Sequence, residues 1–243
     1  MTLSLLSRLF SLEHSLEPDN EQLHANLESI RDRIDHACTR AGRPFQSVRL
    51  IAVTKMHPAS TIQALIDLGV REIGESRVQE IEEKALLLRG NFSLHLIGSL
   101  QTNKAGRVLP KVQWIQSIDR ERLISRIESL HRGGNRIKAL VEVNTTGEAS
   151  KSGCLPDECR RLSEGVAKCS ALEFCGLMTI GPLNGSEKEV RESFALLRRL
   201  GGECRDLAPA VELSMGMSDD FEWAVEEGST MVRIGTALLG KRN

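Results

Sequence analysis

The sequence predicts an α/β protein that folds as a single (β/α)8 barrel. Eight short apolar runs recur along its 243 residues, and patterns typical of amphipathic helices lie between most of them. Parallel strands need crossover connections, usually helical, and eight strand and helix units are the number that closes a barrel. No linker or break in composition marks a second domain, and this length is normal for one α/β barrel.

The eight expected strands are short runs rich in Val, Ile and Leu. The first, RLIAVTK at residues 49–55, is an apolar run that ends in a lysine. Most of the runs are separated by enough residues for a helix to cross from one strand to the next. The other seven occupy residues 70–75, 94–98, 112–118, 137–143, 172–179, 210–214 and 230–234.

A long amphipathic helix is expected before the first strand. Apolar residues recur at alternating steps of four and three from Leu23 to Ala41, and Gly42 to Pro44 follow as an end signal. Only residues 236–243 remain after the last strand, so the eighth helix must be short. The N-terminal helix is therefore a candidate to cover the apolar surface left beside the first and last strands.

Between the strands, helix starts are marked by residues that cap helices or suit their first turn. These are Pro58, Asp119, Pro156, Ser186 with Glu189 as a capping box, and Ser218. The expected helices span residues 58–69, 78–88, 119–134, 156–169, 186–197 and 218–228, and a short helical or irregular piece spans 103–108.

Two regions are expected, an N-terminal extension at residues 1–20 and the barrel domain at residues 21–243. The first ten residues are mildly apolar but lack the basic leading segment of a secretory signal, so a frayed tail or a short packed helix is expected. No run approaches the roughly 20 apolar residues that a membrane-spanning helix needs.

The composition argues against several classes of function. The 32 Lys and Arg residues against 33 Asp and Glu give a formal net charge of −1, unlike a general nucleic-acid binder or a polybasic membrane protein. The six cysteines have no metal-binding spacing, so they are expected to be reduced, mostly buried thiols of a cytoplasmic protein without a metal site. Tyrosine is absent, which removes one type of general acid and base.

Lys55 is the leading candidate for chemistry because it ends the first expected strand. Burial disfavours the charged form of lysine, and a neutral amine can attack an aldehyde to form a Schiff base. The plainer alternative is a lysine at a strand end whose head lies in solvent.

A candidate phosphate site follows the seventh and eighth strands, at the end of the barrel where active sites of this fold form. Glycines with adjacent hydroxyl groups let backbone N–H groups approach a phosphate closely, and a helix that starts at Ser218 would add a favourable dipole. The remaining residues of this site are Ser214, Gly216, Gly235 and Thr236. The plainer interpretation of the glycines is a role in tight turns.

Three other polar residues are expected at the same end of the barrel. Glu75 ends the second strand, Asn144 follows the fifth, and Arg233 lies within the eighth. Arg233 and Asn144 are candidate ligand-binding residues. Glu75 has a plainer interpretation as the partner of Arg77 or Lys55.

An amine beside a phosphate site suits a small molecule that carries both an aldehyde and a phosphate. Pyridoxal 5'-phosphate (PLP) is one such molecule, because its reactive carbon forms an imine with lysine. Sugar phosphates are another, because some aldolases of barrel fold also use a Schiff-base lysine. These residues by themselves leave both possibilities open.

Seven motifs in order resemble the pyridoxal phosphate homeostasis protein family, from about residue 21 to the C-terminus. They are IAVTK (51–55), GESRVQE (74–80), HLIGSLQTNK (95–104), EASKSG (148–153), GLMTI (176–180), LSMGMS (213–218) and VRIGT (232–236). The resemblance implies a fold-type III barrel similar to the N-terminal domain of alanine racemase, with Lys55 as the cofactor lysine. It also implies a cytosolic protein that binds PLP and hands it on, without an established reaction of its own.

The sequence departs from the family pattern at two positions, where Ser76 and Arg77 replace the Asn and Tyr that are common there. Contacts from this loop to the cofactor are the feature that the departure affects.

Two functional classes remain. One is a monomeric PLP carrier with PLP-dependent apoenzymes as candidate recipients, and the other is a racemase or decarboxylase that uses the same imine. A racemase of the related barrel type needs a second base that faces the lysine, and there it is a tyrosine on a second domain. Here the candidates are Glu75, His95 and Cys154, and Arg233 is expected either to neutralise Glu75 or to contact the phosphate or the ring nitrogen. We therefore expect the carrier and assign no catalytic residue.

Overall fold

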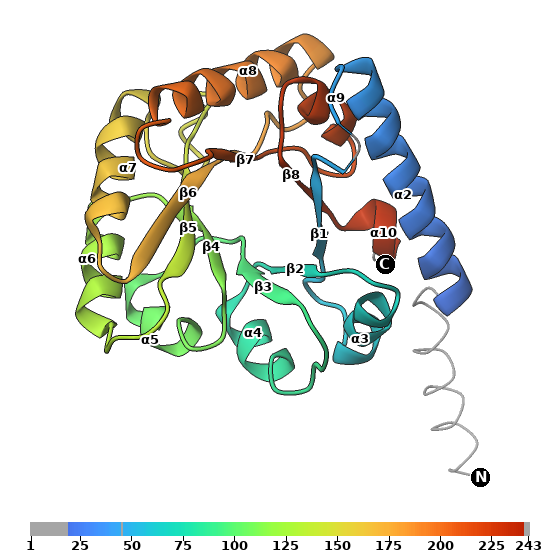
Figure 1. Cartoon of the computed structure of the whole chain (residues 1–243), viewed down its shortest axis with the longest axis horizontal. Helices are drawn as coiled ribbons and strands as arrows, with labels where there is room; N and C mark the ends of the chain where they lie inside the picture. The colour runs from blue at the N-terminus through green and yellow to red at the C-terminus, as the bar shows by residue number, and fades with distance from the viewer. Residues whose placement is uncertain (1–18, 45, 241–243) are drawn as a thin grey trace.

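The computed structural model describes residues 19–44 and 46–240, and eight parallel strands form its centre. Each strand pairs with the next one in the chain, and β8 (Met231–Ile234) pairs with β1 (Arg49–Val53), so that the sheet closes. Helices surround the strands on the outside (Figure 1). The predicted (β/α)8 barrel is confirmed.

All eight strands lie within or overlap the predicted runs. β2, β4 and β7 each begin two residues later than predicted. The six strands between β1 and β8 are β2 (Glu72–Glu75), β3 (Ser93–Leu96), β4 (Trp114–Ile118), β5 (Ile137–Glu142), β6 (Leu172–Met178) and β7 (Glu212–Ser214).

The helices occupy the predicted intervals, with short 3-10 turns before two of them. They are α2 (Asn20–Arg40), α3 (Ala59–Asp67), α4 (Val78–Lys84), η1 (Thr102–Lys104), α5 (Ala105–Val108), α6 (Glu121–Leu130), η2 (Pro156–Glu158), α7 (Cys159–Lys168), α8 (Glu187–Glu203), α9 (Phe221–Glu226) and α10 (Thr236–Leu239). The predicted short piece at 103–108 is therefore η1 with α5.

Helix α2 lies where the sequence suggested, beside the last helices of the barrel. It packs against α9 and α10, and its buried face includes Leu23 and Leu27 (Figure 1). The Asn26 side chain donates a hydrogen bond to the Leu238 carbonyl oxygen at 2.9 Å. The N-terminal helix thus covers the side of the barrel that the short α10 leaves open, which confirms the expectation.

Two of the predicted helix caps are wrong. The N-cap of α6 is Arg120, and Asp119 pairs with the Arg120 guanidinium instead. The N-cap of α9 is Asp220 rather than Ser218, and its side chain makes no capping hydrogen bond. The Asp220 carboxylate instead accepts from the Met217 N–H at 2.6 Å, in the loop before the helix. By contrast, the capping box of Ser186 and Glu189 at the start of α8 is confirmed.

Successive side chains along each strand point to opposite faces of the sheet, so the barrel has an interior that is distinct from the core beneath the helices. The interior contains an apolar cluster of Ile51, Trp114, Leu140, Cys175, Met178 and Met231. Polar and charged side chains lie along the same axis at both ends of this cluster, including Arg49 over the Trp114 ring and the buried Arg233.

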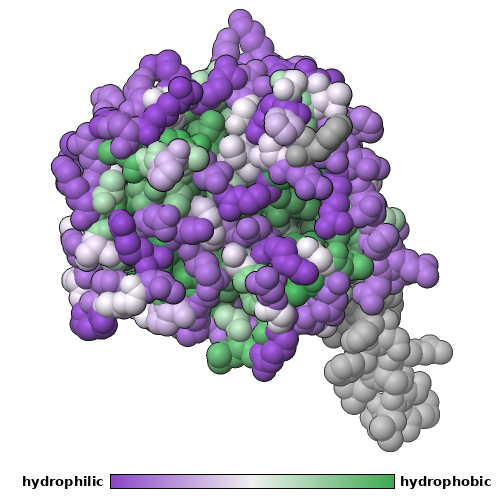
Figure 2. All heavy atoms as spheres, in the orientation of Figure 1, coloured by the Kyte–Doolittle hydropathy of each residue, from purple (hydrophilic) through white to green (hydrophobic). Residues whose placement is uncertain are grey.

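The remaining expectations concern the termini and the surface. The predicted extension at residues 1–20 falls outside the described residues, apart from Asp19 and Asn20 at the start of α2. None of the described helices has an apolar stretch long enough to cross a lipid bilayer. The six cysteines are buried and unpaired, as predicted. On the face seen in Figure 2, hydrophilic residues surround separate hydrophobic patches.

Candidate functional site

Lys55 comes two residues after the last residue of β1, at the carboxyl end of the barrel. Arg49 and Ile51 of β1 lie in the barrel interior. Lys55 lies in the turn after the strand, in which the His57 N–H donates to the Thr54 carbonyl oxygen at 3.1 Å. The Lys55 side chain is exposed rather than desolvated, which agrees with the plainer of the two expectations. Its amine is therefore accessible at the mouth of the barrel.

The loops after β7 and β8 are joined by two hydrogen bonds. The Arg233 N–H donates to the Gly216 carbonyl oxygen at 3.0 Å, and the Ala237 N–H donates to the Ser218 hydroxyl at 3.2 Å. Ser218 therefore connects the two loops instead of capping α9. Together they form one surface at the mouth.

Gly216 is required by the close approach of α9. Its φ is +93°, and a Cβ at this position would lie 2.5 Å from the Ala224 Cβ. Any other residue would push the loop away from the helix.

The backbone of these loops offers donors to a ligand. Within residues 19–44 and 46–240, the N–H groups of Gly216, Gly235 and Thr236 have no hydrogen-bond acceptor. The Thr236 side chain is exposed beside them. Uncommitted N–H groups next to a hydroxyl suit a phosphate.

Strand pairing brings this candidate phosphate site next to Lys55. Ile51 pairs with Arg233 and Ala52 with Ile234 in the β1–β8 ladder. A Cβ on Gly235 would lie 3.4 Å from the Val53 carbonyl oxygen. The chain after β8 therefore lies beside the chain that leads to Lys55, as the sequence predicted for a closed barrel.

Arg233 is a buried cation beneath this surface, with only 4% of its surface exposed. Its guanidinium donates hydrogen bonds to the Ser214 hydroxyl at 2.8 Å and to the Thr179 carbonyl oxygen at 2.7 Å, both neutral acceptors. Burial lowers the pKa of Arg233 to about 10, although Asp220 and Glu142 favour its charged form. A buried arginine without a carboxylate in hydrogen-bond contact can still bind an anion or a ring nitrogen.

The Ser214 hydroxyl is already committed within the barrel. It accepts from Arg233 and donates to the Gln116 side-chain oxygen at 2.7 Å. The Gln116 amide donates to His95 Nδ1 at 2.9 Å, and His95 Nε2 lies 2.7 Å from a Glu72 carboxylate oxygen. Ser214 thus holds Arg233 in place, and His95 lies inside the barrel, on the side of Glu72, rather than at the mouth.

Asn144 also uses its side chain locally. Its amide oxygen accepts from the Thr146 and Gly147 N–H groups at 3.2 and 3.1 Å, and its amide nitrogen donates to the Glu148 carbonyl oxygen at 2.8 Å. This residue therefore shapes the loop after β5.

Glu142 is the residue at the mouth that the sequence reasoning missed. It lines a cavity of about 240 Å³ that is bounded by the ends of β3, β5 and β6, and only 4% of its surface is exposed. Burial raises the pKa of Glu142 to about 7, Asp119 adds to the rise, and Arg233 opposes it. The alternation of Lys138, Leu140 and Glu142 along β5 was the available signal, since Leu140 lies in the barrel interior.

The three candidates for a second base lie elsewhere. Glu75 is bound to the Thr54 hydroxyl and the Lys84 ammonium outside the barrel wall. The interpretation of Glu75 as the partner of Arg77 or Lys55 is therefore wrong, and so is the alternative in which Arg233 neutralises it. Cys154 is buried, and its pKa is raised to about 12 mainly by that burial. Burial also lowers the pKa of His95, although its hydrogen bond with Glu72 opposes this.

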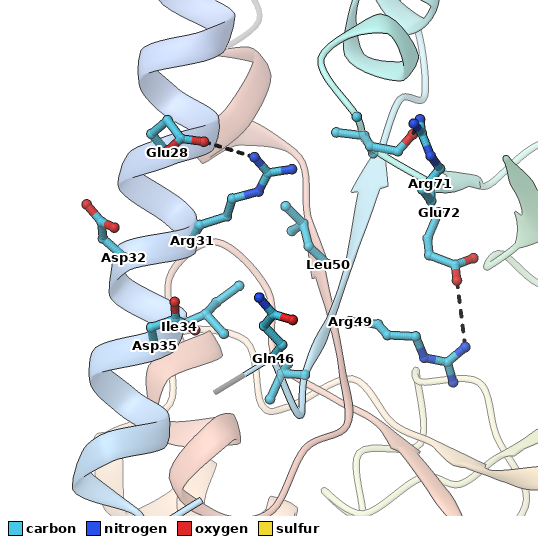
Figure 3. Close-up of a pocket in the computed structure, with 13 residues that line it drawn as sticks. Glu28, Arg31, Asp32, Ile34, Asp35, Gln46, Arg49, Leu50, Arg71 and Glu72 are labelled. Atoms are coloured by element: carbon cyan, nitrogen blue, oxygen red, sulfur yellow. Dashed lines mark hydrogen bonds and ion pairs between the residues drawn. The ribbon is translucent and has the colours of Figure 1, made fainter. Parts of the chain in front are cut away.

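A larger cavity, of about 660 Å³, lies at the opposite end of the barrel between α2 and the starts of β1 and β2 (Figure 3). Its arginines have partners within the protein: Arg31 pairs with Glu28 at 2.9 Å, and Arg71 donates to the Ile66 carbonyl oxygen at 2.9 Å. Its size alone does not make it the functional site, because active sites of this fold lie at the other end.

Comparisons with known proteins agree with this geometry. The family model "Alanine racemase, N-terminal domain" matches residues 25–243. The "Pyridoxal phosphate homeostasis protein" of Aquifex aeolicus (strain VF5) is 40% identical over 220 residues, which cover 89% of this chain and 96% of that protein.

Two solved structures are similar as well. A protein of unknown function from Bifidobacterium adolescentis has a TM-score of 0.85 and 38% identity, and covers 90% of this chain and 95% of its own. PipY of Synechococcus elongatus PCC7942, solved with PLP bound, has a TM-score of 0.71 and 36% identity, and covers 87% of this chain and 100% of its own.

The barrel and the lysine at its mouth define a protein of the alanine racemase N-terminal domain class. Within that class, the chain belongs to the pyridoxal phosphate homeostasis protein family.

Proposed function

We propose that this protein binds PLP at the carboxyl mouth of the barrel, holds it as a Schiff base on Lys55, and carries it within the cell. The observation that supports this most is the placement of the exposed Lys55 amine beside the uncommitted N–H groups of Gly235 and Thr236. PLP supplies an aldehyde that a primary amine can attack and a phosphate that such donors can hold.

Each residue has a distinct role in this proposal. Lys55 bonds the aldehyde carbon, and Gly216, Gly235 and Thr236 donate hydrogen bonds to the phosphate. Arg233 contacts the cofactor from below. Ser214 and Asn144, which the sequence reasoning placed in direct contact with the cofactor, act as supports, because their side chains are committed to Arg233 and to the loop after β5.

The wider setting of the function is also a proposal. The proposed recipients are PLP-dependent apoenzymes, and the proposed acting form is a monomer. The relatives' name, pyridoxal phosphate homeostasis protein, supports a role in PLP homeostasis. The cytoplasm is the proposed compartment, because six unpaired cysteines suit a reducing environment.

Borohydride reduction tests the central assignment. Reduction of the PLP-loaded protein followed by peptide mass mapping should place the pyridoxyl group on Lys55 and leave Lys55→Ala unlabelled. Lys151 is the useful comparison, because it also lies at the mouth but pairs with Glu148 at 2.8 Å. A label found only on Lys151 would contradict the proposal.

The phosphate site has its own test. Pyridoxal lacks the phosphate, so several charge-assisted hydrogen bonds of about 1.5–3 kcal/mol each are absent and its affinity should be far lower. Isothermal titration with PLP and with pyridoxal measures the difference. Equal affinities would show that the proposed site does not bind the phosphate group.

Glu142 supports a second candidate function, proton transfer on a bound amino acid. A carboxyl group with a pKa near 7 at the mouth can exchange a proton at neutral pH. We favour the carrier because a racemase needs two opposed bases and Arg233 would disfavour a protonated ring nitrogen. Incubation with L-amino acids in deuterated water decides between them: α-proton exchange at about 1 s⁻¹ or faster, lost in both Lys55→Ala and Glu142→Gln, would establish catalysis.

A further inference from the structure

A second lysine, Lys84, lies behind the barrel wall close to the strand end that leads to Lys55. Only 8% of its surface is exposed, which is unusual for lysine. Its ammonium donates to Glu75 at 2.8 Å, to Glu80 at 2.6 Å and to the Thr54 carbonyl oxygen at 3.0 Å. These contacts join α4 to the ends of β1 and β2.

The same network contacts the backbone on both sides of Lys55. Before it, the Thr54 carbonyl accepts from Lys84, and the Thr54 hydroxyl donates to Glu75 at 2.7 Å. After it, the Met56 N–H donates to Glu80 at 2.5 Å. Lys55 is therefore the single residue between two points that one buried cluster holds.

The backbone at this point is in an uncommon conformation. Met56 has a φ of +65°, a region that residues other than glycine rarely adopt. Such a conformation persists when surrounding contacts hold it, and strained residues cluster at functional sites. The hydrogen bond from Met56 to Glu80 supplies one such contact.

The cluster is also costly in itself. Two carboxylates and one ammonium are removed from water, and the second oxygens of Glu75 and Glu80 are buried without a hydrogen-bond partner among the described residues. A hydrophobic cluster of similar volume would often stabilise the fold as well or better. The ionic arrangement therefore needs a reason other than stability.

We propose that Lys84, held between Glu75 and Glu80, is a positioning residue that orients Lys55 for bonding to the cofactor aldehyde. The Lys55 side chain is itself exposed, so the direction of its amine depends on the backbone from which it extends. The proposal rests on the assignment of Lys55 as the cofactor lysine, and it adds three residues that never contact the cofactor.

Two ligands separate positioning from general stability. PLP forms a bond with Lys55, whereas pyridoxine 5'-phosphate has the same ring and phosphate but an alcohol in place of the aldehyde. Lys84→Met and Glu80→Gln should lower PLP affinity and the rate of bond formation about tenfold or more, because small displacements of reacting groups have large effects. Affinity for pyridoxine 5'-phosphate should stay within about twofold of wild type.

Three variants complete the experiment. Lys84→Arg should restore most of the PLP affinity, because its guanidinium can reach the same carboxylates. Glu82→Gln is the matched control, because it lies on the same helix but pairs with Arg107 at the surface. Lys55→Ala should bind both ligands with equal, weak affinity, and reducible label in this variant would contradict the assignment of Lys55 instead.

Equal loss of both ligands in Lys84→Met and Glu80→Gln would overturn the proposal and leave a purely structural role for the cluster. Unchanged PLP affinity in both variants would overturn it as well. Should Lys84→Met fail to fold, Glu80→Gln carries the same test, because the substitution keeps the size of the side chain but removes the charge that pairs with Lys84.

Discussion

The two ends of the barrel interior each contain a buried or half-buried arginine, but their surroundings differ. At the amino end, Arg49 lies 2.6 Å from a Glu212 carboxylate oxygen and 3.7 Å from Glu72, and its guanidinium stacks over Trp114. At the carboxyl end, Arg233 donates only to neutral oxygens. Arg49 thus has a carboxylate partner within the protein, and Arg233 has no carboxylate in hydrogen-bond contact among the described residues.

This difference indicates where a ligand belongs. A charge that already has its counter-charge gains little from a ligand, whereas a buried cation without a close carboxylate is stabilised by one. The larger cavity lies at the amino end, where Arg49 pairs with Glu212 and Arg31 pairs with Glu28 (Figure 3). Charge pairing therefore indicates the ligand-binding end of the barrel more reliably than cavity size does.

Substituting the two arginines should give the largest effects and should distinguish the two ends of the barrel. Arg233→Met should lower PLP affinity by about ten- to a hundredfold, because a charged hydrogen bond is worth about 1.5–3 kcal/mol and each 1.4 kcal/mol is a factor of ten. Arg49→Met should leave PLP affinity within about twofold and lower the unfolding free energy by about 1–2 kcal/mol, a small value because Arg49 is partly exposed.

Isothermal titration and chemical denaturation of both variants measure these effects. A loss of PLP affinity in Arg49→Met as large as in Arg233→Met would show that the two ends are not functionally distinct.

The fold could be predicted because a barrel repeats one local pattern eight times. Each strand was visible as an apolar run, and each connection as a helical period or a glycine-rich turn. Lys55, Arg233 and the glycines could be placed at one end because parallel strands all point the same way. These inferences need only sequence order and strand direction.

The orientation of individual side chains was harder to predict. Glu75 and Glu142 both end a strand, yet Glu142 lines the mouth and Glu75 faces α4. Side chains alternate between the inside and the outside of the barrel along each strand, so the position of a glutamate in that alternation decides where it points. A strand start that is predicted one residue too early or too late reverses the predicted direction.

Partners that are distant in sequence could not be predicted. Ser214 and Gln116 are 98 residues apart, and nothing local marks the hydrogen bond between them.

The pH dependence of the unfolding free energy should reveal the buried Glu142 carboxyl group at the mouth. The pKa of Glu142 is about 7 in the folded protein, against about 4.3 in an unfolded chain. The folded state therefore binds more protons between these values, and the unfolding free energy falls as pH rises through this range, by at most about 1.4 kcal/mol per pH unit.

Glu142→Gln removes the titrating carboxyl group and with it this fall in the unfolding free energy. The variant should be more stable than wild type by about 1–3 kcal/mol at pH 8, and the difference should vanish near pH 4. Urea denaturation at several pH values tests it. Glu148→Gln is a suitable control at the same mouth, because the Lys151 hydrogen bond lowers the pKa of Glu148. Glu148 therefore does not titrate in the pH range in which Glu142 changes the unfolding free energy. A pH slope in Glu142→Gln equal to that of wild type would contradict the prediction.

Gln116 connects the two ends of the barrel interior. It is fully buried, and its amide can satisfy the Ser214 hydroxyl and His95 Nδ1 only in one orientation. Because His95 Nδ1 accepts from Gln116, Nε2 must carry the ring proton and donate to Glu72. The tautomer of one histidine thus fixes the direction of every hydrogen bond up to Arg233.

Gln116→Met keeps the volume but leaves the Ser214 hydroxyl proton without an acceptor and His95 Nδ1 without a donor, so the unfolding free energy should fall by about 1–3 kcal/mol. PLP affinity should fall only about threefold, because Arg233 keeps its bond to the Thr179 carbonyl and moves little. Gln116→Glu sharpens the test, since its carboxylate can accept from Ser214 but must draw a proton onto His95 Nδ1. The pKa of His95 in Gln116→Glu, measured by NMR, should rise above the wild-type value. An unchanged pKa would mean that the chain of hydrogen bonds between Glu72 and Arg233 is interrupted at Gln116.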